Sequence, residues 1–179
     1  MLEIFKRDFK TITWILIPIA IIANGAGGWV ITRLNAPLYL DTIGTIFIAI
    51  VAGPFAGAIT GVITNVILGI VSPGYIPYWP VPMLIGLAAG FFAMAGWFKH
   101  WWKVVIVGIL LALIASIFSS LIAEKIFGEI SFNPSYFLVV EPVDKIVTTL
   151  IAFGIGRLLP EQIRKHLPRP ENIESRKTD

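Results

Sequence analysis

The chain has 179 residues and a net charge of +3; 56% of its residues are hydrophobic, 14% are charged, and the mean hydropathy is +0.83. A water-soluble domain of this length would expose too much apolar surface, so the composition predicts an all-α membrane protein with one domain over residues 1–179. The sequence has no Cys and no G-x-x-x-x-G-K motif, which excludes disulfides, thiol chemistry and ATP hydrolysis by a P-loop.

The chain opens with a short amphipathic lead over residues 1–10, followed by an apolar run over residues 12–34. A basic start before an apolar run also occurs in signal peptides, but this run is too long for one and predicts the first transmembrane helix. Ala20, Ala23 and Gly27 belong to a patch of small residues in the middle of this run, which permits close helix contact. That contact is either internal packing or a docking surface for a partner.

Residues 38–65 predict two short membrane helices joined by a tight turn at Gly53, which is followed by Pro. Glycines recur at every fourth position, as Gly53, Gly57 and Gly61, and Asn65 continues the row. On a helix this spacing makes one smooth face that another backbone can approach closely. The amide of Asn65 is expected to find a partner outside its own helix.

The next segment, residues 72–82, contains four prolines and predicts a stiff, non-helical loop. Three further helices are predicted over residues 83–98, 104–127 and 141–159, with a second loop over residues 128–140. The polar tail, residues 160–179, is expected to fray beyond Pro168.

Six helices place both termini on one side of the membrane, and the basic residues indicate which side. Eleven of the 14 Lys and Arg residues lie on the side of the termini, and only Arg33, Lys125 and Lys145 lie on the other. Because cytoplasmic segments carry the excess of Lys and Arg, both termini are predicted to be cytoplasmic. This distribution explains the basic pI through topology rather than through binding to nucleic acid.

With this orientation, most of the unusual polar and aromatic residues fall in the outer half of the bilayer or in outer loops. Polar groups that face lipid are costly, so these side chains are expected to point into an outward-facing pocket. The predicted substrate-binding residues are Asp41, Asn65, Tyr75, Tyr78, Trp79, Ser120, Glu124, Glu141, Asp144, Lys145 and Thr148. Ser116 lies on the same predicted helix face as Ser120 and Glu124.

Each of these residues also has a purely structural interpretation. Asp41 is suited to cap a helix N-terminus, and the carboxylates of Glu141 and Asp144 suit the first turn of the last helix. Lys145 can pair with either of them, and serines in helices often serve packing. The three aromatic residues of the 72–82 loop suit an interface belt.

Catalysis is not expected. Both histidines, His100 and His166, fall in segments that flank the predicted helices, so a metalloprotease site within the membrane has no ligands in suitable spacing. No metal or cofactor is therefore expected.

Two stretches resemble the sequences of a known family: LYLDTIGT at residues 38–45 and AGPFAGA at residues 52–58, followed by Gly61 and Asn65. They are similar to the substrate-binding S components of energy-coupling factor transporters, in the broad riboflavin-type group. In length and six-helix layout, the resemblance covers the whole chain. In amino-acid sequence, it is found mainly in the second and third predicted helices.

The resemblance implies an importer subunit of the prokaryotic plasma membrane that binds a water-soluble vitamin or vitamin precursor in an outward-facing pocket. It also implies partners, namely a transmembrane coupling subunit and two ATPase subunits. In the family, small residues on the first helix contact the coupling subunit, and Ala20, Ala23 and Gly27 are similar in kind.

The sequence favours a neutral or weakly cationic heterocycle, such as a pyridoxine or thiamine precursor, because acidic residues dominate the outer side and an aromatic loop suits stacking. The alternative is a small homo-oligomeric secondary transporter or channel that works without ATPases, since glycine rows also suit oligomerisation. A structural membrane protein would leave the outer polar cluster unexplained.

Overall fold

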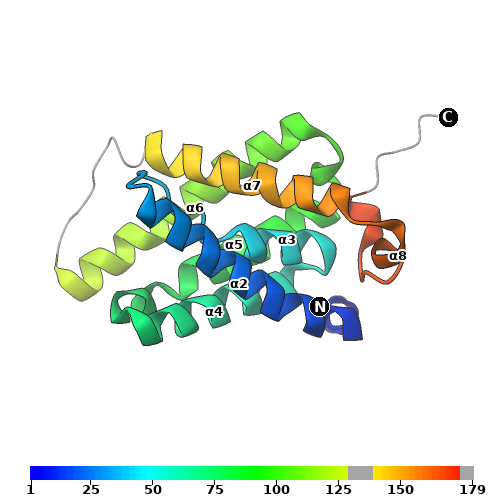
Figure 1. The fold of residues 1–179 in the computed structure, drawn as a ribbon, viewed down its shortest axis with the longest axis horizontal. Coiled ribbons are helices and arrows are strands. Elements are labelled where there is room, and N and C mark those ends of the chain that lie inside the picture. The colour runs from blue at the N-terminus through cyan, green and yellow to red at the C-terminus, as the bar shows by residue number, and fades with distance from the viewer. Residues whose placement is uncertain (129–138, 174–179) are drawn as a thin grey trace.

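The computed structural model describes residues 1–128 and 139–173, and these form helices joined by short connections, with no strand among them (Figure 1). The α-helices are α1 (Leu2–Asp8), α2 (Thr11–Arg33), α3 (Ile43–Val51), α4 (Pro54–Val71), α5 (Pro80–Met94), α6 (Trp101–Phe127), α7 (Glu141–Leu158) and α8 (Glu161–Arg164). The described residues also contain the 3-10 helices η1 (Pro73–Tyr78), η2 (Trp97–Lys99) and η4 (Pro170–Asn172), the last of which follows α8. The predicted all-helical fold is confirmed over these residues.

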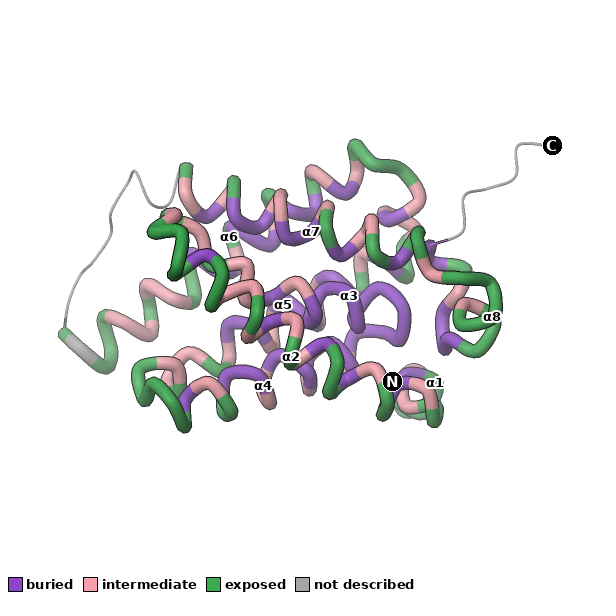
Figure 2. Tube along the Cα trace, viewed as in Figure 1, coloured by how far each residue is buried: buried purple, intermediate pink, exposed green. Residues whose placement is uncertain are grey.

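The short helix α3 lies at the centre of the molecule and contacts α2, α4, α5 and α7. Every residue from Gly44 to Val51 is buried, and Figure 2 shows this helix in purple along its length. Its side chains are almost all apolar, so burial on every face stabilises it through the hydrophobic effect. The 38–65 stretch therefore supplies the core around which the other helices are arranged.

Asn24, in the middle of α2, fixes the beginning of α3. Its Oδ1 accepts hydrogen bonds from the backbone N–H groups of Gly44, at 2.6 Å, and Thr45, at 3.3 Å. Its Nδ2 donates to the hydroxyls of Thr45 and Thr64, at 3.0 and 2.9 Å. The first N–H groups of a helix have no partner within the helix, so a side chain from α2 caps α3 in place of a local residue. The interpretation of Asp41 as the N-cap is wrong, because Thr42 occupies that position.

The close backbone approach predicted for the glycine row is confirmed on α4, where Gly57 faces Ala49 of α3 and Gly61 faces α5. A Cβ atom on Gly86 of α5 would overlap the backbone of Gly57, and one on Gly61 of α4 would overlap the backbone of Pro82. The two helices therefore approach to backbone contact, which only residues without a side chain permit. Asn65, at the end of the row, donates from Nδ2 to the backbone oxygen of Tyr75 at 3.1 Å, so its expected partner lies in η1.

Within the described residues, three helices, α2, α4 and α6, are long and apolar enough to cross a membrane. The other helices of the bundle differ in length or composition: α3 has 9 residues, α5 has 15, and α7 has 18 but carries charged residues in its first turn. The chain is thus helical and is compatible with a membrane protein.

Two predictions about the connections are wrong. Residues 72–82 are not free of helix, since η1 and the first turn of α5 fall within them. Pro73, Pro80 and Pro82 occupy first-turn positions, where the missing N–H would have no helical partner in any case, while Pro77 lies inside η1. The tail does not fray directly beyond Pro168, because Arg169, Asn172 and Ile173 are buried, while its last part, residues 174–179, lies outside the described residues. Most of the predicted second loop, residues 129–138, lies outside the described residues.

Candidate ligand-binding site

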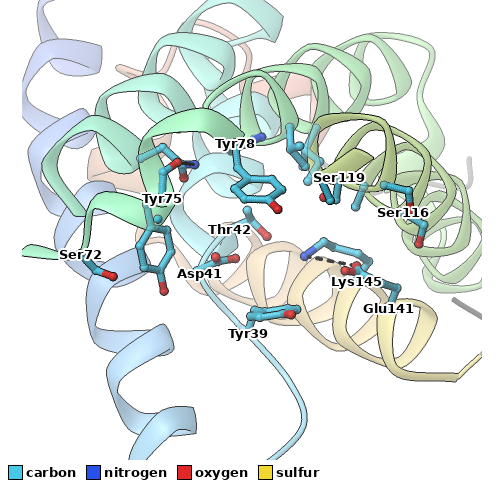
Figure 3. Close-up of a pocket in the computed structure, with 18 residues that line it drawn as sticks. Tyr39, Asp41, Thr42, Ser72, Tyr75, Tyr78, Ser116, Ser119, Glu141 and Lys145 are labelled. Carbon is cyan, nitrogen blue, oxygen red and sulfur yellow. Dashed lines mark hydrogen bonds and ion pairs between the residues drawn. The ribbon is translucent and has the colours of Figure 1, made fainter. Parts of the chain in front are cut away.

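A cavity of about 580 Å³ lies at the end of the bundle away from α1 and α8 (Figure 3). It is formed by the connection between α2 and α3, the C-terminal ends of α4 and α6, η1, and the beginnings of α5 and α7. The lining residues are Tyr39, Asp41, Thr42, Asn65, Ser72, Gly74, Tyr75, Tyr78, Val81, Pro82, Ile85, Ala115, Ser116, Ser119, Ser120, Ala123, Glu141 and Lys145. The volume and the mixed apolar and polar wall are typical of a site for one small molecule.

Asp144 does not line the cavity, but it positions the segment between α2 and α3 that forms one of its walls. Its Oδ1 accepts hydrogen bonds from the backbone N–H groups of Tyr39, at 2.8 Å, and Leu40, at 2.9 Å. Leu40 has a φ of 48°, an uncommon conformation for a residue with a branched side chain. The buried carboxylate therefore holds the chain in a sharp bend that brings Asp41 and Thr42 into the wall.

The ion pairs of α7 form the most polar part of the cavity. Lys145 Nζ lies 2.6 Å from Asp144 Oδ2 and 4.0 Å from Glu141 Oε2, and all three side chains are less than 10% exposed. Figure 3 shows the Lys145 side chain extending from α7 toward Asp41, with the pair to Glu141 drawn as a dashed line. The expected pairing of Lys145 with an acidic residue of its own helix is confirmed, and the shorter pair is the one with Asp144.

Several buried polar atoms of the cavity have no hydrogen-bond partner. Across the described residues, four buried side-chain atoms lack one, and three of these belong to the lining: Thr42 Oγ1, Ser116 Oγ and Glu141 Oε2. A buried polar group without a partner costs about 1–3 kcal/mol, so such groups are rare in a finished structure. Their concentration in one cavity indicates that a ligand or water completes their hydrogen bonds.

Aromatic side chains from η1 and from the α2–α3 connection add flat surfaces to the wall. Burial, followed by the nearby carboxylate of Glu141, raises the pKa of Tyr39 to about 12. Burial also raises the pKa of Tyr75, and it raises the pKa of Asp41 above its ordinary value. Burial thus favours the neutral form of both phenols, and a neutral phenol is a hydrogen-bond donor as well as an acceptor.

The structure brings seven of the predicted substrate-binding residues together in the lining and leaves four outside it. The seven are Asp41, Asn65, Tyr75, Tyr78, Ser120, Glu141 and Lys145. Outside the lining, Trp79 and Glu124 are exposed, while Asp144 and Thr148 are buried behind the wall, where the Thr148 hydroxyl donates to the backbone oxygen of Asp144 at 2.7 Å.

Sequence reasoning omitted several lining residues from the site. On α6, the residues that face the cavity are Ala115, Ser116, Ser119, Ser120 and Ala123, a stripe at helical spacing. The predicted face ran from Ser116 through Ser120 to Glu124 and missed Ser119, although its spacing from Ser116 would have indicated it. Tyr39 and Thr42 lie within two positions of Asp41, and only the bend held by Asp144 shows that all three face the cavity.

The small residues of α2 lie mostly against the rest of the chain. Ala20 is 3% exposed and packs against Gly44, and Gly27 lies against the backbone of Leu40. Ala23 is half-buried. These contacts correspond to internal packing, the simpler of the two interpretations of this patch.

Across the described ranges, no three His, Asp or Glu side chains come together in a way that could hold a metal ion. Comparison with protein-family models, with characterised proteins and with solved structures found no match. The geometry of the cavity is therefore the main guide to function.

Proposed function

We propose that the chain is the substrate-binding S component of an energy-coupling factor transporter, which captures a water-soluble vitamin or vitamin precursor outside the cell. The observation that carries the proposal is the cavity of about 580 Å³ with three buried, unpartnered polar atoms in its wall. Such groups favour a specific small-molecule ligand over a packing role. The resemblance of residues 38–65 to the family supports the same conclusion.

In this proposal α2 to α7 each cross the plasma membrane, both termini are cytoplasmic, and the cavity opens outward. The excess of Lys and Arg at the end with the termini supports this orientation. α3 and α5 are shorter than the roughly 20 residues that a hydrocarbon core of about 30 Å requires. The bilayer is therefore locally thin around the bundle, or the connections dip into it.

The proposed partners are a transmembrane coupling subunit and two ATPase subunits. Because Ala20 and Gly27 are engaged inside the chain, the face of α2 that is open to a partner is the one with Ile15, Ile19 and Ile22, which are 57%, 58% and 70% exposed. Contact through this face replaces the small-residue contact that the resemblance implies.

Native mass spectrometry of the purified protein tests the proposal, with identification of any small molecule released on denaturation. We expect one ligand per chain, because tight binders dissociate slowly. The variant Ser119→Trp places a bulky side chain in the cavity and is expected to abolish retention. The matched control Phe118→Trp changes the neighbouring exposed residue and should retain the ligand. A protein that stays empty even after incubation with a cell extract would contradict the proposal.

Uptake assays separate the proposed importer from a secondary transporter. Cells that express the chain with the ATPase subunits should accumulate the identified ligand, and cells without them should not. Uptake that persists without the ATPases would favour the homo-oligomeric transporter.

A further inference from the structure

The polar wall of the cavity contains more negative than positive groups. Asp41 and Glu141 line it, and Asp144 lies directly behind it. Among the described lining residues, Lys145 is the only cation. Three carboxylates therefore surround one ammonium group at this end of the molecule.

The ammonium group of Lys145 does not satisfy all three carboxylates. Its hydrogen bond goes to Asp144 at 2.6 Å, whereas Glu141 Oε2 lies 4.0 Å away and accepts no hydrogen bond. Glu141 is only 6% exposed, so water screens its charge weakly. A buried carboxylate without a full partner is costly, and a second cation near Glu141 would remove that cost.

The opposite part of the wall is aromatic and apolar. Tyr75 and Tyr78 come from η1, while Val81, Pro82 and Ile85 come from α5. Figure 3 shows both tyrosine rings bordering the cavity that Lys145 and Glu141 enter from α7. Aromatic faces stack on flat rings and also attract cations.

We infer that the ligand is a flat aromatic or heteroaromatic molecule with a positive charge, whose charged N–H group donates a hydrogen bond to Glu141. The inference rests on the proposed function of the same cavity and narrows its substrate class. Asp41 contributes further negative charge, and the hydroxyls of Thr42 and Ser116 bind the polar atoms of the ring. An anionic ligand would meet two lining carboxylates with the one lysine already paired.

Three probes of nearly the same shape test this inference: benzamidinium, which is cationic, benzamide, which is neutral, and benzoate, which is anionic. Their binding to ligand-depleted protein is measured by isothermal titration calorimetry at neutral pH. We expect benzamidinium to bind at least tenfold more tightly than benzamide, and benzoate to bind most weakly. Glu141→Gln should reduce the first ratio to near one.

The matched control is Glu124→Gln, the same substitution at an exposed residue outside the lining, and it should leave the ratio unchanged. Asp41→Asn provides a second variant, with a smaller expected decrease, in case Glu141→Gln fails to fold. A ratio that stays the same in both cavity variants, or tighter binding of benzoate, would overturn the inference.

The outcome also separates this inference from the proposed function. A neutral or anionic molecule released from the purified protein would overturn the charge assignment and leave the proposed function standing. If no molecule is released and none of the three probes binds, both fall together.

Discussion

Buried charges occur at both ends of the molecule, and the two sites differ in how completely their hydrogen bonds are met. At the end near the termini, Asp8 and Arg169 form an ion pair that we call the terminal clamp, with Arg169 Nη2 at 2.9 Å from Asp8 Oδ1. Asp8 Oδ2 accepts the backbone N–H of Phe55, and Arg169 Nε also donates to the backbone oxygen of Ala52. Both carboxylate oxygens therefore have hydrogen-bond partners, whereas Glu141 Oε2 in the cavity has an ion pair with Lys145 at 4.0 Å but no hydrogen bond. Buried charged groups whose hydrogen bonds are all formed stabilise the fold, whereas buried charged groups with unmade hydrogen bonds indicate a binding site.

The clamp closes the turn between α3 and α4. Phe55 belongs to the first turn of α4, so Asp8 caps that helix from α1. The tail caps the end of α3, since the Arg169 N–H donates to the oxygen of Val51 and Asn172 Nδ2 donates to the oxygen of Ile50. The central helix is thus fixed by side chains that are far away in the sequence.

The largest effect on stability is expected from Asp8→Ala. The substitution leaves Arg169 buried at 4% exposure without its carboxylate and removes the cap of α4. Breaking a buried pair by removing one partner costs about 3–5 kcal/mol in the free energy of unfolding. Unfolding in mixed detergent micelles measures the loss. Glu3→Ala, at an exposed site on the same helix, is the control, and equal stability of the two variants would refute a structural role for the clamp.

A somewhat smaller loss is expected from Gly53→Ala. Gly53 has a φ of 131°, which residues with a side chain rarely adopt, and a Cβ there would overlap the Asp8 carboxylate. Strain of this kind costs about 1–3 kcal/mol, and displacement of the clamp adds to it. Gly154→Ala is the matched control, because no atom lies within 4 Å of its Cβ position. The same unfolding assay should show no loss for the control, and a stable Gly53→Ala variant would contradict the expectation.

Structural features could be predicted from the sequence where the interacting residues lie close together in the chain, and not where they lie far apart. The glycine face of α4 and the helix over 141–158 were predicted correctly, because their signals are local patterns of residue type and spacing. The burial of Arg169 was not predicted, since a polar and charged tail resembles a frayed end and its partner Asp8 lies 161 positions away. For the same reason, the bend that Asp144 holds at Leu40, 104 positions away, could not be inferred.

The candidate site was predicted in part for a related physical reason. Depth in the membrane follows from topology, so residues such as Glu141, Lys145 and Asn65 could be assigned to one end of the bundle. Depth does not determine which side of a helix faces inward, which explains why Glu124 lies outside the cavity lining and Ser119 within it. The role of Asn24 was not predicted, because its four hydrogen bonds depend on the positions of α3 and α4.

A further loss of stability is expected from Asn24→Ala. The substitution leaves the N–H of Gly44 buried without its acceptor and removes the link to Thr64. An unmet buried group costs about 1–3 kcal/mol, so the free energy of unfolding should fall by about that amount. Thr32→Ala removes a hydrogen bond on the exposed part of the same helix and should change stability by no more than about 0.5 kcal/mol. Equal effects of the two substitutions would show that the buried network adds nothing.

The smallest effect on stability, and the clearest contrast with the clamp, is expected from Ser116→Ala. Ser116 is 6% exposed and its hydroxyl has no hydrogen-bond partner, so the substitution removes a buried polar group without breaking a hydrogen bond. The unfolding free energy of the ligand-free protein should stay unchanged or rise by up to about 1 kcal/mol. Binding of the ligand should weaken several-fold, because the hydrogen bond between the Ser116 hydroxyl and the ligand is lost.

The variant Asn172→Ala, which removes a buried amide with a hydrogen-bond partner at the other end, should show the opposite pattern, with lower stability and unchanged affinity. If Ser116→Ala lowers stability and leaves affinity unchanged, the hydroxyl serves the fold, and the distinction between the two ends of the molecule does not hold at this residue.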